Sequence, residues 1–103
     1  MMDVTAKNFD SIVNHHDSVL VDFYATWCGP CKLQGNILTA FEEKYPNRFT
    51  VAKVDVDTEA ALAQRYGITT VPTLIVFRKG EPALRAEGVQ TLDKLEQMLG
   101  AAQ

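Results

Sequence analysis

Cysteine is scarce in this chain, and basic runs and long apolar runs are missing. The 103 residues include only two cysteines, fewer than a secreted disulfide scaffold of this size would carry. No apolar stretch approaches the roughly 20 residues that a membrane-spanning helix needs. The net charge is −3 and no basic stripe offers a nucleic-acid footprint. No signal-peptide pattern opens the chain. We therefore expect a cytoplasmic protein that binds neither nucleic acid nor membrane.

The two cysteines, Cys28 and Cys31, are separated by only two residues. A disulfide between them would close a very short loop, for which chain entropy gives roughly 2 kcal/mol of stabilisation. The pair therefore indicates chemistry rather than a structural cross-link. Half of a zinc site is the alternative, but structural zinc takes four ligands and only His15 and His16 remain as candidates. We expect both histidines in an exposed loop.

Strand-like and helix-like segments alternate along the chain, which is typical of one α/β domain over residues 1–103. The continuous apolar run at 19–25 predicts a strand buried on both faces. Further strands are expected at 4–5, 49–56, 73–78 and 83–87, the last at a sheet edge because Pro82 cannot donate to a ladder. Helices are expected at 7–14, at 28–45, from a cap at Asp57 or Thr58 to Gly67, and after Thr91.

The long helix at 28–45 is indicated by apolar residues at every fourth position, with Leu38 beside them: Leu33, Ile37, Phe41 and Tyr45. Its strand–helix–strand unit predicts that the cysteine pair lies at the carboxyl end of a central strand, where sites form in open α/β sheets.

Cys28 at the helix start meets unpaired N–H groups and the positive end of the helix dipole, which favour the thiolate. Cys31, one turn further in, is expected to be more shielded and to keep its proton longer. Cys28 is therefore predicted to attack and Cys31 to resolve the mixed disulfide. Gly29 lets a protein substrate come close, and Pro30 suits the first helical turn.

Four segments carry a resemblance to a known family. Residues 21–32 read Val-Asp-Phe-Tyr-Ala-Thr-Trp-Cys-Gly-Pro-Cys-Lys, and similar motifs follow at 51–57, 66–68 and 71–74. Together they resemble the thioredoxin family over essentially the whole chain. The resemblance implies an α/β thioredoxin fold, with a central mixed five-stranded sheet flanked by four helices and the first three strands parallel.

The same resemblance implies a thiol–disulfide oxidoreductase that reduces protein disulfides through a reversible Cys28–Cys31 disulfide. It implies no bound cofactor, and electrons from NADPH delivered by a thioredoxin reductase. Its expected partners are that reductase and disulfide-containing proteins, and the expected state is a monomer.

Pro72 and Asp22 gain roles from the resemblance. The Val71-Pro72 bond is implied to be cis and to lie against the cysteines, with Val71 pairing to an incoming peptide, although the residues alone favour a trans proline at a strand start. Asp22 is a carboxylate inside an apolar strand, where burial would raise its pKa. The resemblance implies a buried base that takes the proton from Cys31 and is tuned by Lys53; the alternative is an Asp at a solvated strand edge.

The resemblance also implies a substrate groove. Trp27 is implied to be an indole beside the nucleophile, and simple core packing is its alternative. The other implied groove residues are Gly29, Pro30, Val56, Thr70, Val71, Gly88 and Val89.

Two places depart from the family pattern. Asn36 replaces a proline that kinks the long helix, and Gln34 occupies a usually apolar position. We predict a helix that bends near Gly35 without a proline kink. Glu87 replaces an apolar groove residue, so it either selects basic substrates or points outward from an edge strand.

Two other functions compete with disulfide reduction. One is a binding module whose groove docks partners without turnover, which the intact set of Cys28, Cys31, Asp22, Lys53 and Pro72 argues against. The other is an oxidant or isomerase of an exported compartment. Such relatives often carry a histidine between the cysteines, whereas Gly29-Pro30 supplies no charge to stabilise the thiolate.

Overall fold

The apolar run near residue 20 forms the central strand of a five-stranded sheet. The computed structural model describes residues 1–101. In chain order the elements are β1 (Met2–Asp3), α1 (Phe9–Asn14), β2 (Ser18–Tyr24), α2 (Gly29–Lys44), β3 (Thr50–Asp55), α3 (Ala60–Arg65), β4 (Thr73–Arg78), β5 (Glu81–Glu87) and α4 (Leu92–Leu99). No helix within this range has the length and apolar character needed to cross a membrane.

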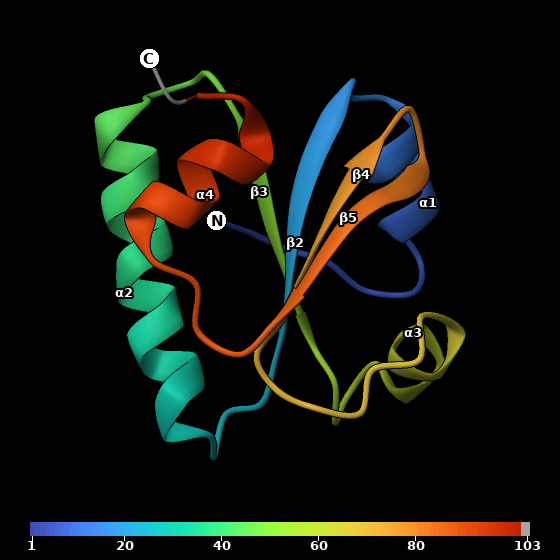
Figure 1. Ribbon diagram of the computed structural model, residues 1–103. Helices are drawn as coiled ribbons and strands as arrows, with labels where there is room; N and C mark the ends of the chain where they lie inside the picture. The colour runs from blue at the N-terminus through green and yellow to red at the C-terminus, as the bar shows by residue number, and fades with distance from the viewer. Residues whose placement is uncertain (102–103) are drawn as a thin grey trace.

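The strands lie in the order β1-β3-β2-β4-β5. β1, β3 and β2 are parallel, whereas β4 pairs antiparallel with β2 and β5 antiparallel with β4. Helices α2 and α4 cover one face of the sheet, and α1 and α3 lie on the other (Figure 1). The predicted mixed five-stranded sheet with four flanking helices is confirmed.

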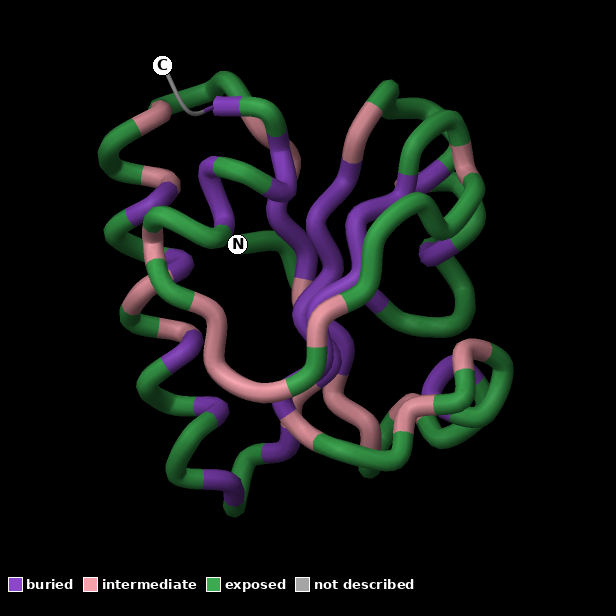
Figure 2. The backbone as a smooth tube through the Cα atoms, viewed as in Figure 1, coloured by how far each residue is buried: buried purple, intermediate pink, exposed green. Residues whose placement is uncertain are grey.

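Each face of the sheet carries its own apolar core because alternate strand residues point to opposite faces. Val19, Val21 and Phe23 of β2 pack with α1 and α3. Leu20 packs on the opposite face with α2 and α4. Asp22 is separated from Leu20 by one residue, so its side chain points to the α2 side. The buried backbone of the central strands lies between largely exposed outer turns (Figure 2).

Several predicted boundaries are wrong. The first strand is Met2–Asp3 rather than 4–5, although the Val4 N–H still donates to the Lys53 carbonyl and Val4 is buried. Helix α3 begins at Ala60 without a side-chain cap from Asp57 or Thr58. The last strand starts earlier than expected and includes Pro82, which the sheet edge and a bulge at Val76/Phe77 accommodate.

The four-residue repeat in α2 is right for Phe41, which is buried, and for Ile37 and Tyr45, which pack against the same core, but it is wrong for Leu33, which is exposed. The buried residues of the helix are Cys31, Gln34, Leu38 and Phe41. Spacing of three and four residues defines the stripe that faces a core, and Gln34 interrupted the apolar pattern of that stripe. The helix is continuous from Gly29 to Lys44. The bend near Gly35 stays a prediction.

Candidate active site

The cysteines form a disulfide at the start of α2. Cys28 is the N-cap residue with an extended backbone, and its Sγ accepts a hydrogen bond from the Cys31 N–H at 3.2 Å. Pro30 lies in the first turn, where its missing N–H costs little. The free N–H groups and dipole of this 16-residue helix favour a negative charge on Cys28. Both cysteines are 5% exposed, so the predicted greater shielding of Cys31 is wrong in the disulfide form.

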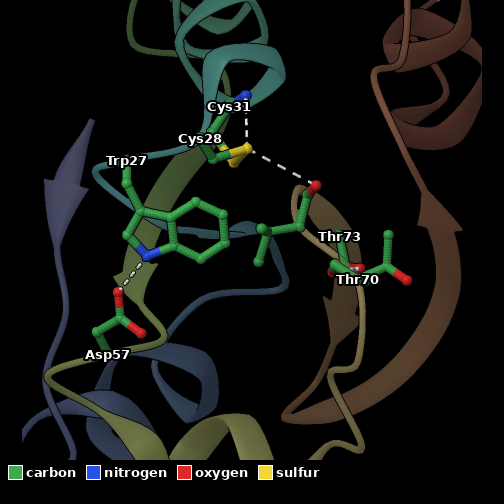
Figure 3. The surroundings of a disulfide bond; sticks show 7 residues. Trp27, Cys28, Cys31, Asp57, Thr70 and Thr73 are labelled. Atoms are coloured by element: carbon green, nitrogen blue, oxygen red, sulfur yellow. Dashed lines mark hydrogen bonds between the residues drawn. A yellow bond between two sulfur atoms is a disulfide. The ribbon is translucent and has the colours of Figure 1, made fainter.

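A cis peptide bond between Val71 and Pro72 faces the disulfide. The Cys28 Sγ lies 3.8 Å from the Val71 carbonyl oxygen (Figure 3). Val71 is half-buried and packs against the cluster formed by Ala25, Cys28 and Cys31. The turn is held by the Thr73 hydroxyl, which donates to the Thr70 carbonyl at 2.6 Å. This segment therefore places a backbone edge directly beside the reactive sulfur.

Asp22 is buried behind the disulfide on the α2 side of the sheet. Its side chain shares a cavity of about 280 Å³ with Cys31, Tyr24, Gly35 and Lys53. The residue is 3% exposed, and its Oδ1 has no hydrogen-bond partner. Burial raises the pKa of Asp22 to about 7, and the positive charge of Lys53 opposes this only in part. The alternative of a solvated edge aspartate is therefore wrong.

Lys53 lies on β3 directly opposite Asp22 in the sheet register. Its ammonium group pairs with the Asp3 carboxylate at 3.6 Å and sits 5.3 Å from the centre of the Tyr24 ring. Lys53 therefore acts on Asp22 through its field rather than through a direct ion pair, and the carboxyl remains without a hydrogen bond at Oδ1.

The Trp27 side chain lies in the open beside the disulfide (Figure 3). It is 70% exposed, so core packing is excluded. The indole Nε1 donates to Asp57 Oδ2 at 2.8 Å, and the Asp57 N–H donates to Asp55 Oδ1 at 2.9 Å. The turn after β3 thus orients an exposed aromatic surface next to Cys28. The sequence pattern did not identify Asp57 as the partner of the indole.

The chain as a whole matches a family model. The model for thioredoxin covers residues 1–101. This chain belongs to the thioredoxin family. A thioredoxin of Alicyclobacillus acidocaldarius is 39% identical over 98 residues, which is 95% of this chain and 93% of that protein. The structure of a mutant thioredoxin from Halobacterium salinarum superimposes with a TM-score of 0.88 at 37% identity, over 97% of this chain and 88% of that one.

A third relative is the bifunctional thioredoxin reductase/thioredoxin of Mycobacterium leprae. It is 40% identical over 85 residues, which is 82% of this chain and 19% of that longer protein. The thioredoxin family, the thioredoxin fold and the disulfide at the start of α2 make this protein a thiol–disulfide oxidoreductase, as predicted. No group of three or more metal-ligating side chains occurs within residues 1–101.

The remaining groove residues implied by the thioredoxin pattern lie on several loops. Gly29 and Pro30 are exposed at the start of α2, and Thr70 is exposed before the cis bond. Val56 is half-buried and packs against the cysteine cluster. Gly88 has a positive φ of 83°, and its N–H donates to the Pro72 carbonyl at 2.8 Å. Val89 follows it, half-exposed, without a contact that assigns it a role.

Both departures from the thioredoxin pattern have polar partners. Glu87 is exposed at the end of β5, and its carboxylate pairs with Arg85 at 3.5 Å. Gln34 is fully buried, and its amide pairs with the backbone of Gln90. Gln34 stands out in the sequence as a polar residue at a usually apolar position, but its role cannot be recognised there because its partner lies 56 residues away.

Proposed function

We propose that this protein carries electrons to disulfide bonds in other proteins, with Cys28 as nucleophile and Cys31 as resolving thiol. The observation that carries the proposal is the Cys28 Sγ at the N-terminus of α2, 3.8 Å from the Val71 carbonyl beside the cis bond. An extended peptide that paired with the Val71 backbone would bring its own disulfide to Cys28.

Reduction of the substrate disulfide takes place in two thiol–disulfide exchange steps. In the reduced protein the Cys28 thiolate attacks one sulfur of the substrate disulfide, a mixed disulfide forms and the first substrate thiolate leaves. The Cys31 thiol then loses its proton and attacks Cys28 Sγ, which releases the second substrate thiolate. The substrate gains two electrons, and the protein is left with the Cys28–Cys31 disulfide.

Asp22 is proposed to accept the proton of Cys31. The two residues line one cavity, and a base works best when its pKa lies near the working pH. Burial raises the pKa of Asp22 to about 7, which meets that condition. The cavity has room for a water molecule to bridge the carboxylate and the sulfur. Lys53 is proposed to tune the carboxyl through its charge.

The electron source is proposed to be NADPH acting through a thioredoxin reductase. The Mycobacterium leprae relative, whose name joins a thioredoxin reductase to a thioredoxin, supports this partner. We also propose a cytoplasmic protein, because a disulfide reductant works where thiols are kept reduced. We propose a monomer, since helices of the same chain cover both apolar faces of the sheet.

The test is the reduction of insulin, followed first with dithiothreitol as the electron source and then with NADPH and a thioredoxin reductase. Wild type turns over, Cys28→Ser is inactive and Cys31→Ser accumulates a mixed disulfide. Thr39→Ser, a small change on the exposed side of α2, is the control that retains activity.

Turnover that survives in Cys28→Ser would overturn the assignment of the nucleophile. Binding of the oxidised substrate without any turnover by wild type would favour a binding module instead. Activity with dithiothreitol but not with the reductase would reject only the proposed electron source.

A further inference from the structure

Gln34 is a fully buried amide on the helix that carries the cysteines. It lies three residues after Cys31 on the buried side of α2, and its relative exposure is 0%. Burying an amide is unfavourable unless its polar atoms find partners. An apolar side chain would fill the same space without that cost. The amide therefore does something besides fill the core.

Both ends of the amide pair with one residue. Gln34 Nε2 donates to the Gln90 carbonyl at 3.1 Å, and the Gln90 N–H donates to Gln34 Oε1 at 2.6 Å. The amide thus forms the same pair of hydrogen bonds, one donated and one accepted, that a neighbouring strand forms with a residue in a β-sheet. This pair of hydrogen bonds holds the position and the orientation of the backbone at Gln90.

Gln90 in turn forms hydrogen bonds within the segment between β5 and α4. Its side-chain Nε2 donates to the carbonyls of Glu87 and Gly88, both at 3.1 Å. The Gly88 N–H then donates to the Pro72 carbonyl at 2.8 Å. A continuous series of hydrogen bonds therefore links α2 to the cis-proline turn that faces Cys28.

We infer that Gln34 is a positioning residue for the substrate groove, because it holds the Gly88–Gln90 segment in register against Pro72. The inference rests on the proposed function, in which a protein substrate docks along the Val71-Pro72 turn. Gln34 is buried, so it acts through the segment and not by touching the substrate. Residues 88–90 are half-exposed, so a docked peptide can reach them.

The decisive variant is Gln34→Leu, which places an apolar side chain of similar size in the core and removes both hydrogen bonds. The loss of about one net hydrogen bond corresponds to a factor of roughly five in an equilibrium constant. We expect KM for insulin to rise about fivefold or more. We expect kcat, and the rate with a small disulfide reagent that needs no groove, to change less than about twofold.

Gln34→Met is the second variant, in case Gln34→Leu does not fold. Methionine is unbranched like glutamine and fills irregular core space, but it replaces neither the donor to the Gln90 carbonyl nor the acceptor for the Gln90 N–H, so KM rises here too. Leu38→Ala is the matched control, since Leu38 is buried one turn further along α2. It lowers the free energy of unfolding but leaves KM for insulin unchanged.

Amide hydrogen exchange tests the positioning without any activity. In Gln34→Leu the Gly88 and Gln90 N–H groups exchange about tenfold faster or more, while amides of the central strands do not. Unchanged exchange at these two amides overturns the inference, and so does a KM that stays constant in a folded variant. A proportional loss with insulin and the small disulfide, or an equal rise of KM in Leu38→Ala, also overturns it. An inactive wild type rejects the proposed function, and the exchange result still decides whether Gln34 holds the segment.

Discussion

Among single residues, Asp22 stands out because burial strongly disfavours the charged form of its carboxyl group. Because side chains alternate along β2, the carboxyl points away from the face covered by α1 and α3 and lines the cavity that it shares with Cys31. Lys53 lies opposite on β3, but its ammonium group is engaged with Asp3. Desolvation therefore outweighs the attraction of Lys53 and keeps the Asp22 pKa near 7.

This raised pKa makes stability depend on pH. A folded pKa of about 7 against an ordinary value of 3.8 means that the folded protein binds a proton that the unfolded chain releases between these values. The favourable contribution is complete below about pH 4 and is lost as the pH rises to about 7. The difference between the two pKa values lowers the free energy of unfolding above about pH 7 by on the order of 4 kcal/mol, relative to its value in acid.

Asp22→Asn removes this dependence because the amide does not ionise. In urea unfolding of the disulfide form, we expect the variant to gain stability over wild type as the pH rises from about 4 to about 7, and to keep a constant advantage above that. Asp93→Asn, an exposed aspartate on α4, is the control without such a trend. Parallel pH profiles of wild type and Asp22→Asn would contradict the raised pKa.

The same variant tests the proposed proton transfer. Without the carboxylate, the Cys31 thiol has no buried base, so resolution of the mixed disulfide slows by roughly a hundredfold or more. The attack of Cys28 on the substrate is expected to change little. Rapid-quench separation of the mixed disulfide measures the two steps apart, and unchanged resolution across neutral pH would count against the role of Asp22.

Among the secondary-structure elements, α2 carries both the reactive cysteine pair and a stripe of buried core residues. Its first turn carries Cys28 and Cys31, and the buried stripe continues through Gln34, Leu38 and Phe41. Gly35 and Asn36 interrupt an otherwise good helix-forming stretch. Apart from its chain neighbours and the backbone of its own helix, a methyl group added at Gly35 would meet no atom of residues 1–101 within 4 Å.

Gly35→Ala is therefore expected to stabilise the protein by about 1 kcal/mol, because alanine loses less backbone entropy in a helix interior. Gly67→Ala is the matched comparison. It also has open space, but its φ of 63° lies in the left-handed region, so alanine there destabilises by about 1 kcal/mol. Urea unfolding of both variants checks the opposite signs. Equal effects at the two glycines would refute the explanation.

At the scale of the whole molecule, contacts between distant helices close the fold over the α2 face of the sheet. Glu96 of α4 is largely buried and accepts hydrogen bonds from the Lys44 ammonium group and the Tyr45 hydroxyl at the end of α2. The hydrogen bond from Lys44 is the main reason that the pKa of Glu96 is lowered, and the bond from Tyr45 adds to it. The charged form of Glu96 therefore ties α4 to α2.

Glu96→Gln is expected to lower the free energy of unfolding at neutral pH. A lowered pKa means that the contribution is present above the ordinary glutamate range and is lost as the pH falls through the folded value. The gap between wild type and variant therefore closes in acid. Glu43→Gln, exposed on α2, is the control. A gap that does not depend on pH would show that Glu96 contributes by packing alone.

The residues alone predicted the order of elements, the α/β class and the reactive pair, whereas the mixed five-stranded sheet came from the resemblance to the thioredoxin family. The apolar run of β2, the cap-like position of Cys28 and the spacing to Cys31 act over a few residues, so they can be recognised without knowing what lies nearby. The wrong predictions were also local: the start of β1, the cap of α3 and the burial of Leu33 on α2.

The surroundings of the reactive pair depend on contacts between segments that lie far apart in the sequence. The tertiary structure left Asp22 without a partner at Oδ1, directed Lys53 to Asp3, set the Trp27 indole on Asp57 and joined Gln34 to Gln90 across 56 residues. Periodicity and capping depend on neighbours along the chain. Desolvation and side-chain pairing depend on which distant strands and loops the fold brings together.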